Sequence, residues 1–210
     1  RTRPYESTKG TVDALHEKWL KAAQHNVKSA SIFEFNKNMK QIIREFDTIE
    51  LLNIKKPRVG VVGEILVKYS KTANNDIVNI IEEEGGEAVV LDLIGFMNYS
   101  LYNQIWRTDE IGFAKKNKLM AKTLLGIINM LEKPMNTALT KSERFDGIES
   151  IYDIASNTED IISVGNHTGE GWFLTGEMIE LLQKDVKNIV CLQPFGCLPN
   201  QSQMSISTAG

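Results

Sequence analysis

The chain has 210 residues, of which 42% are hydrophobic and 24% are charged, and its formal net charge is −3. Such a composition is typical of a globular protein, and we expect no nucleic-acid partner and no binding to anionic membranes. No apolar run reaches about 18 residues, so we expect no transmembrane helix, and the N-terminal residues do not predict a signal peptide. Two cysteines are fewer than a secreted disulfide scaffold carries, so we expect a cytoplasmic protein.

The first 55 residues have the pattern of helices. Apolar residues recur at a spacing of three to four over 12–22, which places them on one helical face. Ser31 and Glu34 have the spacing of a capping box, in which each side chain bonds a backbone N–H near the helix start. We therefore expect a second helix after Ser31 and an N-terminal helical segment over residues 1–55.

The remainder of the chain alternates between strand and helix patterns. Four short apolar runs predict buried strands: 58–63, 88–93, 160–165 and 188–192. Helical patterns separate them, including an amphipathic one over 173–184, and right-handed crossovers make such strands parallel. We therefore predict an α/β protein in which residues 56–200 form a small doubly wound, flavodoxin-like parallel sheet of about four strands. The polar residues 201–210 are expected to be a disordered or artefactual tail.

Capping residues and prolines predict where helices begin and end. Residues 74–76 (Asn-Asn-Asp) predict a helix start, and the mostly helical stretch from 96 to 132 is expected to end before Pro134. Asp146 and Glu149 favour the start of the next helix.

In an open parallel sheet, ligands bind beyond the carboxyl ends of the strands. The loop after the first predicted strand begins with Gly63 and Glu64 and leads to a helix N-terminus, which favours anions. Lys68 and Lys71 add positive charge for a phosphate, so Gly63 and Glu64 are candidate cofactor-binding residues. The alternative is that the glycine only turns the chain and that Glu64 is a hydrogen-bonding loop residue.

The loop after the third predicted strand contains three glycines within seven residues: Gly165, Gly169 and Gly171. Glycines allow tight turns and the close approach of a ligand, so these three are candidate cofactor-binding residues. His167 and Glu170 bring two titratable groups to the same loop and are the candidate catalytic residues. Alternatively, the glycines simply connect a strand to a helix. Trp172 is expected to be a packing residue.

The loop after the last predicted strand places Cys197 on a turn that two prolines and Gly196 stiffen. A thiolate held in this way is a nucleophile, a redox group or a ligand for a soft metal. The residues by themselves leave open that Cys197 is an ordinary loop cysteine. Cys191 lies in an apolar strand and is expected to be inert, and its spacing to Cys197 is not that of a metal knuckle.

Four motifs occur in order along the chain: Arg3–Glu6, Pro57–Glu64, His167–Trp172 and Gln193–Asn200. Together they resemble the C-terminal part of the large CoA-substrate-specific enzyme activases. That part is similar to the D-component, the β subunit, of 2-hydroxyacyl-CoA dehydratases such as 2-hydroxyglutaryl-CoA dehydratase. The resemblance extends over residues 1–200.

The resemblance implies an oxygen-sensitive, anaerobic system in which an ATPase module drives low-potential electrons into an iron–sulfur partner. It also implies flavodoxin-like subdomains and a four-iron cluster that is held by cysteines from separate loops. Cys197 matches a cluster-facing cysteine, that is, a metal ligand, and residues 165–171 would line the same cleft. The expected partners are the ATPase module and the remaining cluster-binding modules of the parent protein.

The chain also departs from the family pattern. A four-iron cluster usually takes four cysteines, whereas this chain has two, and no ATPase phosphate loop is visible. After Asn200 the sequence does not continue as the family's does. We therefore expect a fragment of an iron–sulfur electron-transfer protein that is inactive alone, with one cluster ligand and an absent or incomplete cluster.

Two other functions remain open. The loops at Gly63 and Gly165 would suit an acyl-CoA or a nucleotide that binds without a cluster, with its phosphates at helix N-termini. Alternatively, an apolar surface on the first two helices would make the chain a structural subunit-contact domain, including a homodimer. Neither the substrate nor the oligomeric state can be predicted from the sequence.

Overall fold

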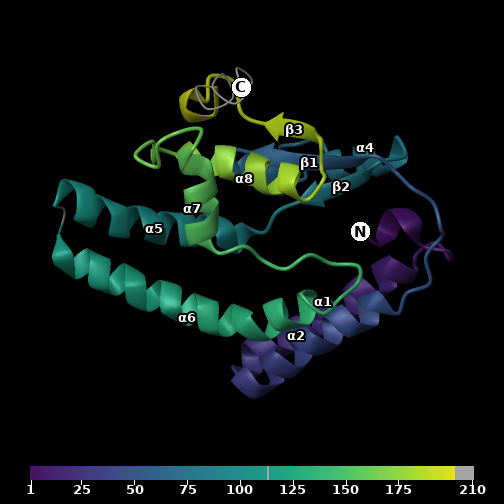
Figure 1. Ribbon diagram of the computed structural model, residues 1–210. Helices are drawn as coiled ribbons and strands as arrows, with labels where there is room; N and C mark the ends of the chain where they lie inside the picture. The colour runs from purple at the N-terminus through teal and green to yellow at the C-terminus, as the bar shows by residue number, and fades with distance from the viewer. Residues whose placement is uncertain (113, 202–210) are drawn as a thin grey trace. The chain divides into compact units, whose positions relative to one another are not determined.

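The computed structural model describes residues 1–112 and 114–201. No helix within these ranges combines the length and the hydropathy that a membrane crossing requires. Beyond residue 201, the predicted tail lies outside the described residues. The elements in chain order are η1 (Arg3–Tyr5), α1 (Thr11–Ser29), α2 (Ile32–Asp47), β1 (Arg58–Gly63), α3 (Ile65–Tyr69), α4 (Ile77–Glu83), β2 (Glu87–Val90), α5 (Leu93–Ile111), α6 (Lys115–Leu139), α7 (Ile151–Glu159), α8 (Gly171–Gln183) and β3 (Asn188–Leu192) (Figure 1).

The chain divides into two compact units. Unit 1 combines Arg1–Lys55 with Gly126–Ile148, and unit 2 combines Lys56–Leu125 with the chain from Glu149 onward. Unit 1 is therefore built from two stretches that are far apart in sequence, and helix α6 contributes residues to both units.

In unit 1, α1 packs against α2. Ser31 caps α2, because its hydroxyl accepts a hydrogen bond from the Glu34 N–H at 3.2 Å, which confirms the predicted capping residue. Trp19 is buried on α1, and its Nε1–H donates to the Glu45 carboxylate at 3.0 Å. Lys18 forms an ion pair with the same carboxylate at 2.6 Å. Polar contacts therefore join the two helices in addition to apolar packing.

The loop after α6 closes unit 1 against the end of α2. The Arg144 guanidinium donates to the backbone carbonyls of Phe46 and Ile49. The Ser142 hydroxyl donates to Asp47 Oδ1 at 2.6 Å. The last carbonyl groups of a helix have no partner within the helix, so these bonds stabilise the C-terminal end of α2.

Unit 2 is built on a parallel sheet, which has three strands in the order β2-β1-β3 over the described residues. β1 is central, and its Val61 and Val62 are fully buried, as expected for a strand that is covered on both faces. In the register, Val61 is paired with Val90 of β2 and with Val190 of β3. The predicted α/β class is confirmed, whereas a fourth strand and a flavodoxin-like winding are not.

The predicted strand at 160–165 is wrong, because these residues form turns after α7. The N–H groups of Ile161 and Ile162 both donate to the Thr158 carbonyl at 2.9 Å, which continues the last turn of the helix. Ile162 and Val164 are buried in a cluster formed mainly by helices, not in the sheet. A short apolar run indicates burial, but it does not by itself distinguish a strand from another buried segment.

Helix α8 is buried nearly all round, although its sequence predicted an amphipathic helix. One side packs on the sheet in a cluster formed by Val62, Leu174, Met178, Leu181 and Val186. Trp172 and Phe173, at the start of α8, belong to a second cluster with side chains from α5, α6 and α7. The helix therefore lies between the sheet and the helical layer of unit 2 (Figure 1). The packing role expected for Trp172 is confirmed, since this side chain is fully buried.

Two helix starts show how far local capping signals extend. The helix start predicted at residues 74–76 is confirmed: Asp76 is the N-cap of α4, and Asn74 rather than Asp76 accepts a hydrogen bond from the Ile77 N–H, at 3.3 Å. Helix α7 begins after Ser150, whose hydroxyl accepts from the Asp153 N–H at 3.2 Å, and not at Asp146. Asp146 and Ser150 are both capping residues. The apolar residues that follow Ser150 are buried, and their packing favours the helix start at Ser150.

Pro134 lies inside α6 and does not end it. A proline within a helix leaves the carbonyl four residues earlier without its usual hydrogen bond. That carbonyl belongs to Met130, which is exposed, so water can replace the missing partner. The helix therefore continues to Leu139, past its predicted end.

Candidate functional site

The carboxyl ends of β1 and β3 lie side by side in the sheet, since Gly63 is paired with Leu192. Gly63 has a φ of +133°, and a Cβ atom there would lie 2.0 Å from the Leu192 carbonyl oxygen. Glycine is therefore required for the two backbones to approach this closely. The Glu64 N–H donates to the same carbonyl at 2.8 Å where the chain leaves the sheet.

Asn200 and Glu170 join three distant segments at this edge of the sheet. Asn200 is fully buried, and its amide is taken in the orientation that gives both of its polar atoms a partner. It then accepts from the Glu64 N–H at 2.9 Å and donates to Glu170 Oε2 at 3.0 Å. Glu170 is 8% exposed, and its Oε1 accepts from the Ile65 N–H at 3.2 Å. We refer to Glu64, Glu170 and Asn200 as the strand-end cluster.

Helix α3 begins directly after Glu64, where the sequence predicted a loop. Two carboxylates of the chain accept hydrogen bonds from backbone N–H groups in the first turn of α3. Glu64 Oε2 accepts a hydrogen bond from the Val67 N–H at 2.8 Å, and Glu170 Oε1 accepts one from the Ile65 N–H at 3.2 Å. These carboxylates occupy the place at the helix N-terminus that a phosphate would take. Glu64 is therefore a capping residue, which agrees with its alternative interpretation as a hydrogen-bonding loop residue.

Lys68 does not extend toward a ligand. Its ammonium group pairs with Glu177 Oε1 of α8 at 2.5 Å, and the two side chains are 3% and 4% exposed. The predicted phosphate-binding role of Lys68 is therefore wrong, because its charge is already neutralised inside the protein. Burial raises the pKa of Glu177 to about 7; the Lys68 charge opposes this rise, and the charges of Glu180 and Asp92 add to it. Lys71 remains exposed.

The three glycines of the loop between α7 and α8 all take part in close packing. A Cβ on Gly165 would lie 3.1 Å from the Trp106 ring. Gly169 has a φ of +63°, and a Cβ there would lie 3.0 Å from Pro199, so this loop packs against the segment that follows β3. Gly171 has a φ of +45°, and a Cβ there would meet a backbone carbonyl oxygen at 2.1 Å. Cofactor binding by these glycines stays a prediction.

The candidate catalytic residues His167 and Glu170 have different surroundings. Glu170 belongs to the strand-end cluster, whereas the His167 ring packs against Trp106 of α5 with the ring centroids 5.5 Å apart. Among the described residues, His167 Nδ1 is buried without a hydrogen-bond partner. No hydrogen bond in this part of the chain links the imidazole to the carboxylate, so the geometry supports Glu170, but not His167, as part of the strand-end site.

Cys197 is the last residue of a β-turn, since its N–H donates to the Pro194 carbonyl at 3.2 Å. Gly196 has a φ of +76°, which the third position of a type II turn requires. The Cys197 carbonyl accepts from the Gln201 N–H at 3.0 Å in the helical turn that follows. The predicted turn is therefore confirmed, and its stiffness stays a prediction. Cys197 is half-buried, and the neighbouring Phe195 is fully exposed.

The two cysteines differ in their surroundings. Cys191 lies on β3, and burial raises the pKa of its thiol to about 11, an effect to which the charges of Glu177 and Cys197 add. Within residues 1–112 and 114–201, no three His, Cys, Asp or Glu side chains are grouped so that they could hold a metal ion. Cys197 therefore belongs to no such group, and the described residues by themselves do not fit a complete iron–sulfur cluster.

Two residues of the site were not singled out from the sequence. Asn200 ends the Gln193–Asn200 motif, so the motif itself was the signal for it. Glu177 is 109 residues from Lys68, and no local pattern pairs them. The signal that could have found it is a carboxylate in a helix of otherwise apolar character, since buried charges are nearly always paired.

The structure therefore brings together part of the predicted site. Gly63, Glu64 and Glu170 converge with the segment that carries Cys197, and His167 lies apart from their hydrogen bonds. No protein-family model, no curated protein and no solved structure matches the chain, so the strand-end cluster is interpreted from its own geometry.

Proposed function

We propose that this chain is the dehydratase-like module of an iron–sulfur electron-transfer protein, related to the activases and 2-hydroxyacyl-CoA dehydratases that its motifs resemble. In that role it supplies one thiolate, Cys197, on a stiff turn at the carboxyl ends of the strands. The remaining thiolates and the ATPase belong to other modules of a cytoplasmic assembly. The flavodoxin-like winding of the complete parent domain is part of the same proposal.

The convergence of three motifs carries the proposal. Glu64, Glu170 and Asn200 come from three motifs that are far apart in sequence, and Asn200 hydrogen-bonds both of the others. Ligands of open parallel sheets bind beyond the carboxyl ends of the strands, which is where these motifs meet. Cys197 precedes Asn200 on the same segment, so the buried amide anchors the turn that carries the thiol.

The chemistry of the two thiols supports one ligand in this chain. A cluster is held by thiolates, and burial raises the pKa of the Cys191 thiol to about 11, which makes its thiolate harder to form. Cys197 lies outside the strands on the Pro194 turn. The other ligands therefore have to come from another segment or another chain.

Anaerobic reconstitution of the chain with the complementary cysteine-bearing modules tests the proposal. We expect Cys197→Ser to lower the iron and sulfide bound by the assembly. The matched variant Cys191→Ser should leave both unchanged. Equal iron contents in the two variants, or no iron in the unmodified assembly, would contradict the proposal.

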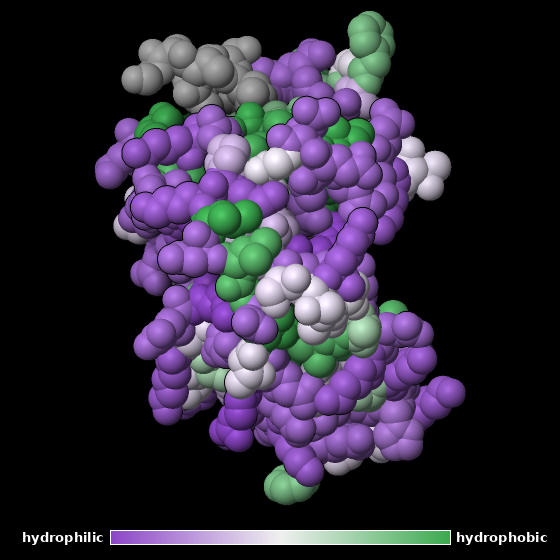
Figure 2. All heavy atoms as spheres, turned by 90° about the vertical axis from the view of Figure 1, so that its right-hand side faces the viewer, coloured by the Kyte–Doolittle hydropathy of each residue, from purple (hydrophilic) through white to green (hydrophobic). Residues whose placement is uncertain are grey.

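A structural subunit-contact role is the second candidate, and one observation in unit 1 favours it. At the turn between α1 and α2, Val27, Ile32 and Phe33 are 82%, 61% and 83% exposed. Grouped apolar side chains at a surface mark contact sites more often than scattered ones do. The face shown in Figure 2 is mostly hydrophilic, with hydrophobic side chains in separate groups. In analytical ultracentrifugation, Val27→Ser/Phe33→Ser should convert an associated chain to a monomer; a monomeric unmodified chain would contradict this role.

The acyl-CoA or nucleotide alternative loses its expected anchor at the first loop. The Lys68 ammonium pairs with Glu177, and the Ile65 N–H at the start of α3 donates to Glu170. Neither the ammonium nor this N–H is therefore open to a phosphate. Calorimetry with CoA thioesters tests what remains of this alternative, namely the glycine-rich loop before α8. Binding that is lost in Gly169→Ala would support it, and no heat of binding would exclude it.

A further inference from the structure

Unit 1 contains a pocket of about 340 Å³ between α2 and the C-terminal end of α6. Helix α2 contributes Lys40, Ile43 and Arg44, which share one helical face at a spacing of three and four. The end of α6 contributes Pro134 and Ala138, which share a face in the same way. The volume lies at the lower end of the range for small-molecule pockets.

Three basic side chains line the pocket without a partner among the described residues. Lys40, Arg44 and Lys141 make no ion pair or side-chain hydrogen bond within the described part of the chain. The carboxylate that lines the pocket, Asp47, already accepts a hydrogen bond from the Ser142 hydroxyl at 2.6 Å. Three basic groups against the one carboxylate of Asp47 give the lining a net positive charge, although the whole chain carries −3. Like charges that are gathered on one surface repel each other, and a bound anion relieves that repulsion.

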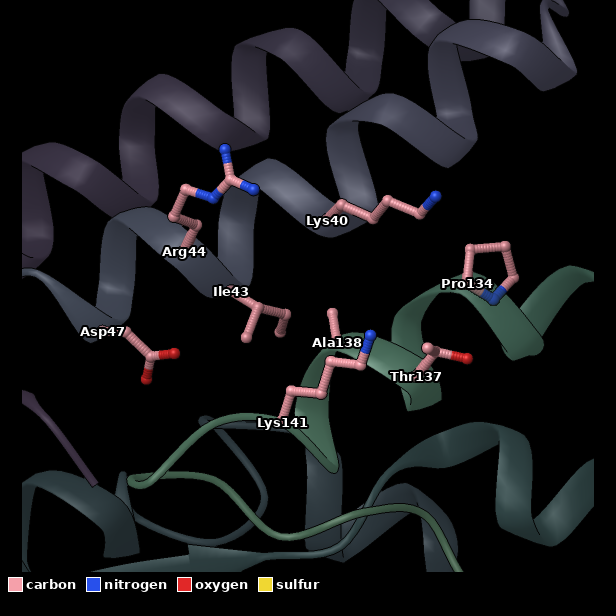
Figure 3. A pocket seen from close by; sticks show the side chains of 8 residues that line it. All are labelled: Lys40, Ile43, Arg44, Asp47, Pro134, Thr137, Ala138 and Lys141. Atoms are coloured by element: carbon pink, nitrogen blue, oxygen red, sulfur yellow. The ribbon is translucent and has the colours of Figure 1, made fainter.

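The basic residues that line the pocket come from two parts of unit 1 (Figure 3). Lys141 extends from the turn after α6 into the space between the helices, and Lys40 extends along this space from α2. The Arg44 guanidinium points away from Lys141 in this view and lies at the rim. Ile43 and Ala138 face the same space from opposite helices, so an apolar patch lies beside the amino groups.

We propose that this pocket binds a small organic phosphate. Lys40 and Lys141 hold the phosphate group by charge-assisted hydrogen bonds, and Arg44 adds a donor from the rim. The patch of Ile43 and Ala138 holds a compact apolar group that is attached to the phosphate. The pocket is too small for a peptide or a nucleic acid, whose interfaces extend over far larger areas. The proposal does not depend on the function of the strand-end cluster, which belongs to unit 2.

Isothermal titration calorimetry of the 210-residue chain with phenyl phosphate tests this inference, because phenyl phosphate joins a phosphate to a compact apolar ring. We expect saturable binding that weakens with added salt, since the contacts are exposed and ionic. Inorganic phosphate should bind more weakly because it leaves the apolar patch empty. Lys40→Gln/Lys141→Gln should weaken the binding of phenyl phosphate by about tenfold or more, and Arg44→Gln should weaken it less.

The matched control is Lys37→Gln/Lys133→Gln. These exposed lysines lie on the same two helices outside the pocket, so the control removes the same charge and should leave the affinity unchanged. Circular dichroism confirms that both double variants remain folded. The absence of saturable binding, an equal loss in the control, or an equal affinity for inorganic phosphate would each overturn the proposal.

Discussion

Asn200 bonds two polar groups of the strand-end cluster at once: its amide oxygen shares the Glu64 N–H with the Leu192 carbonyl, and its amide nitrogen donates to the Glu170 carboxylate. Asn200→Ala removes both bonds inside a fully buried site, and we expect it to lower the free energy of unfolding by about 1–3 kcal/mol. Urea denaturation measures this loss. Gln193→Ala, an exposed position on the same segment, should change the free energy by less than about 0.5 kcal/mol. A loss no larger than that of the control would contradict the bonding assigned to Asn200.

The two thiols should differ in reactivity. Burial raises the pKa of Cys191 to about 11. At about pH 8, roughly one Cys191 in a thousand is therefore a thiolate, the form that reacts. We expect iodoacetamide to modify Cys197 in the folded chain and Cys191 only after denaturation, as read by mass spectrometry of the peptides. Rapid modification of Cys191 in the folded chain would contradict the raised pKa that its partial burial in β3 gives it.

At the scale of elements, the junction of β1 and β3 depends on one glycine. Gly63→Ala combines the strain of a positive φ, about 1–3 kcal/mol, with a clash against the Leu192 backbone. Gly196→Ala also has a positive φ, but its Cβ would have no atom within 4 Å. We expect Gly63→Ala to lower the free energy of unfolding clearly more than Gly196→Ala in urea denaturation. Equal losses of unfolding free energy in the two variants would contradict the prediction, because they would mean that the backbone at Gly63 can move to accept a Cβ atom.

The buried ion pair of Lys68 and Glu177 joins α3 to α8 and should make stability depend on pH. Burial raises the pKa of Glu177 from 4.5 to about 7, so the folded chain keeps a proton that the unfolded chain has already lost. The stability contributed by Glu177 is therefore fully present below pH 4.5 and is lost as the pH rises toward 7. Glu177→Gln should remove this slope from the unfolding free energy, whereas the exposed Glu143→Gln should keep it. Identical slopes in the two variants would refute the assignment.

At the scale of the whole molecule, the two units should unfold separately. Among the described residues, the buried hydrophobic side chains of unit 1 are Val12 and Trp19, whereas unit 2 contains both hydrophobic clusters. Less buried apolar area gives less stability, so we expect unit 1 to unfold at a lower urea concentration. Trp19→Phe leaves Trp106 and Trp172 as fluorophores of unit 2, while circular dichroism follows both units. Coincident transitions by the two methods would show that the units unfold as one.

Much of the fold could be predicted because its signals act over a few residues. The cap at Ser31, the buried run that becomes β1 and the turn before Cys197 depend on capping, periodicity and turn residues, and the structure contains all three. The α/β class follows from the same local alternation. In the candidate site, the motifs that contain Glu64, Glu170 and Asn200 could be located on the chain, but not the hydrogen bonds between these residues.

Long-range packing decided the remainder. The apolar run at 160–165 predicted a strand, but its residues form turns that are buried among helices. The sequence position of Lys68 predicted a phosphate-binding residue. In the structure Lys68 pairs with Glu177 of α8, which is 109 residues away along the chain. The physical reason is the same in both cases. A residue's polarity and charge determine whether it needs burial or a partner, and only the meeting of distant surfaces determines which partner it obtains.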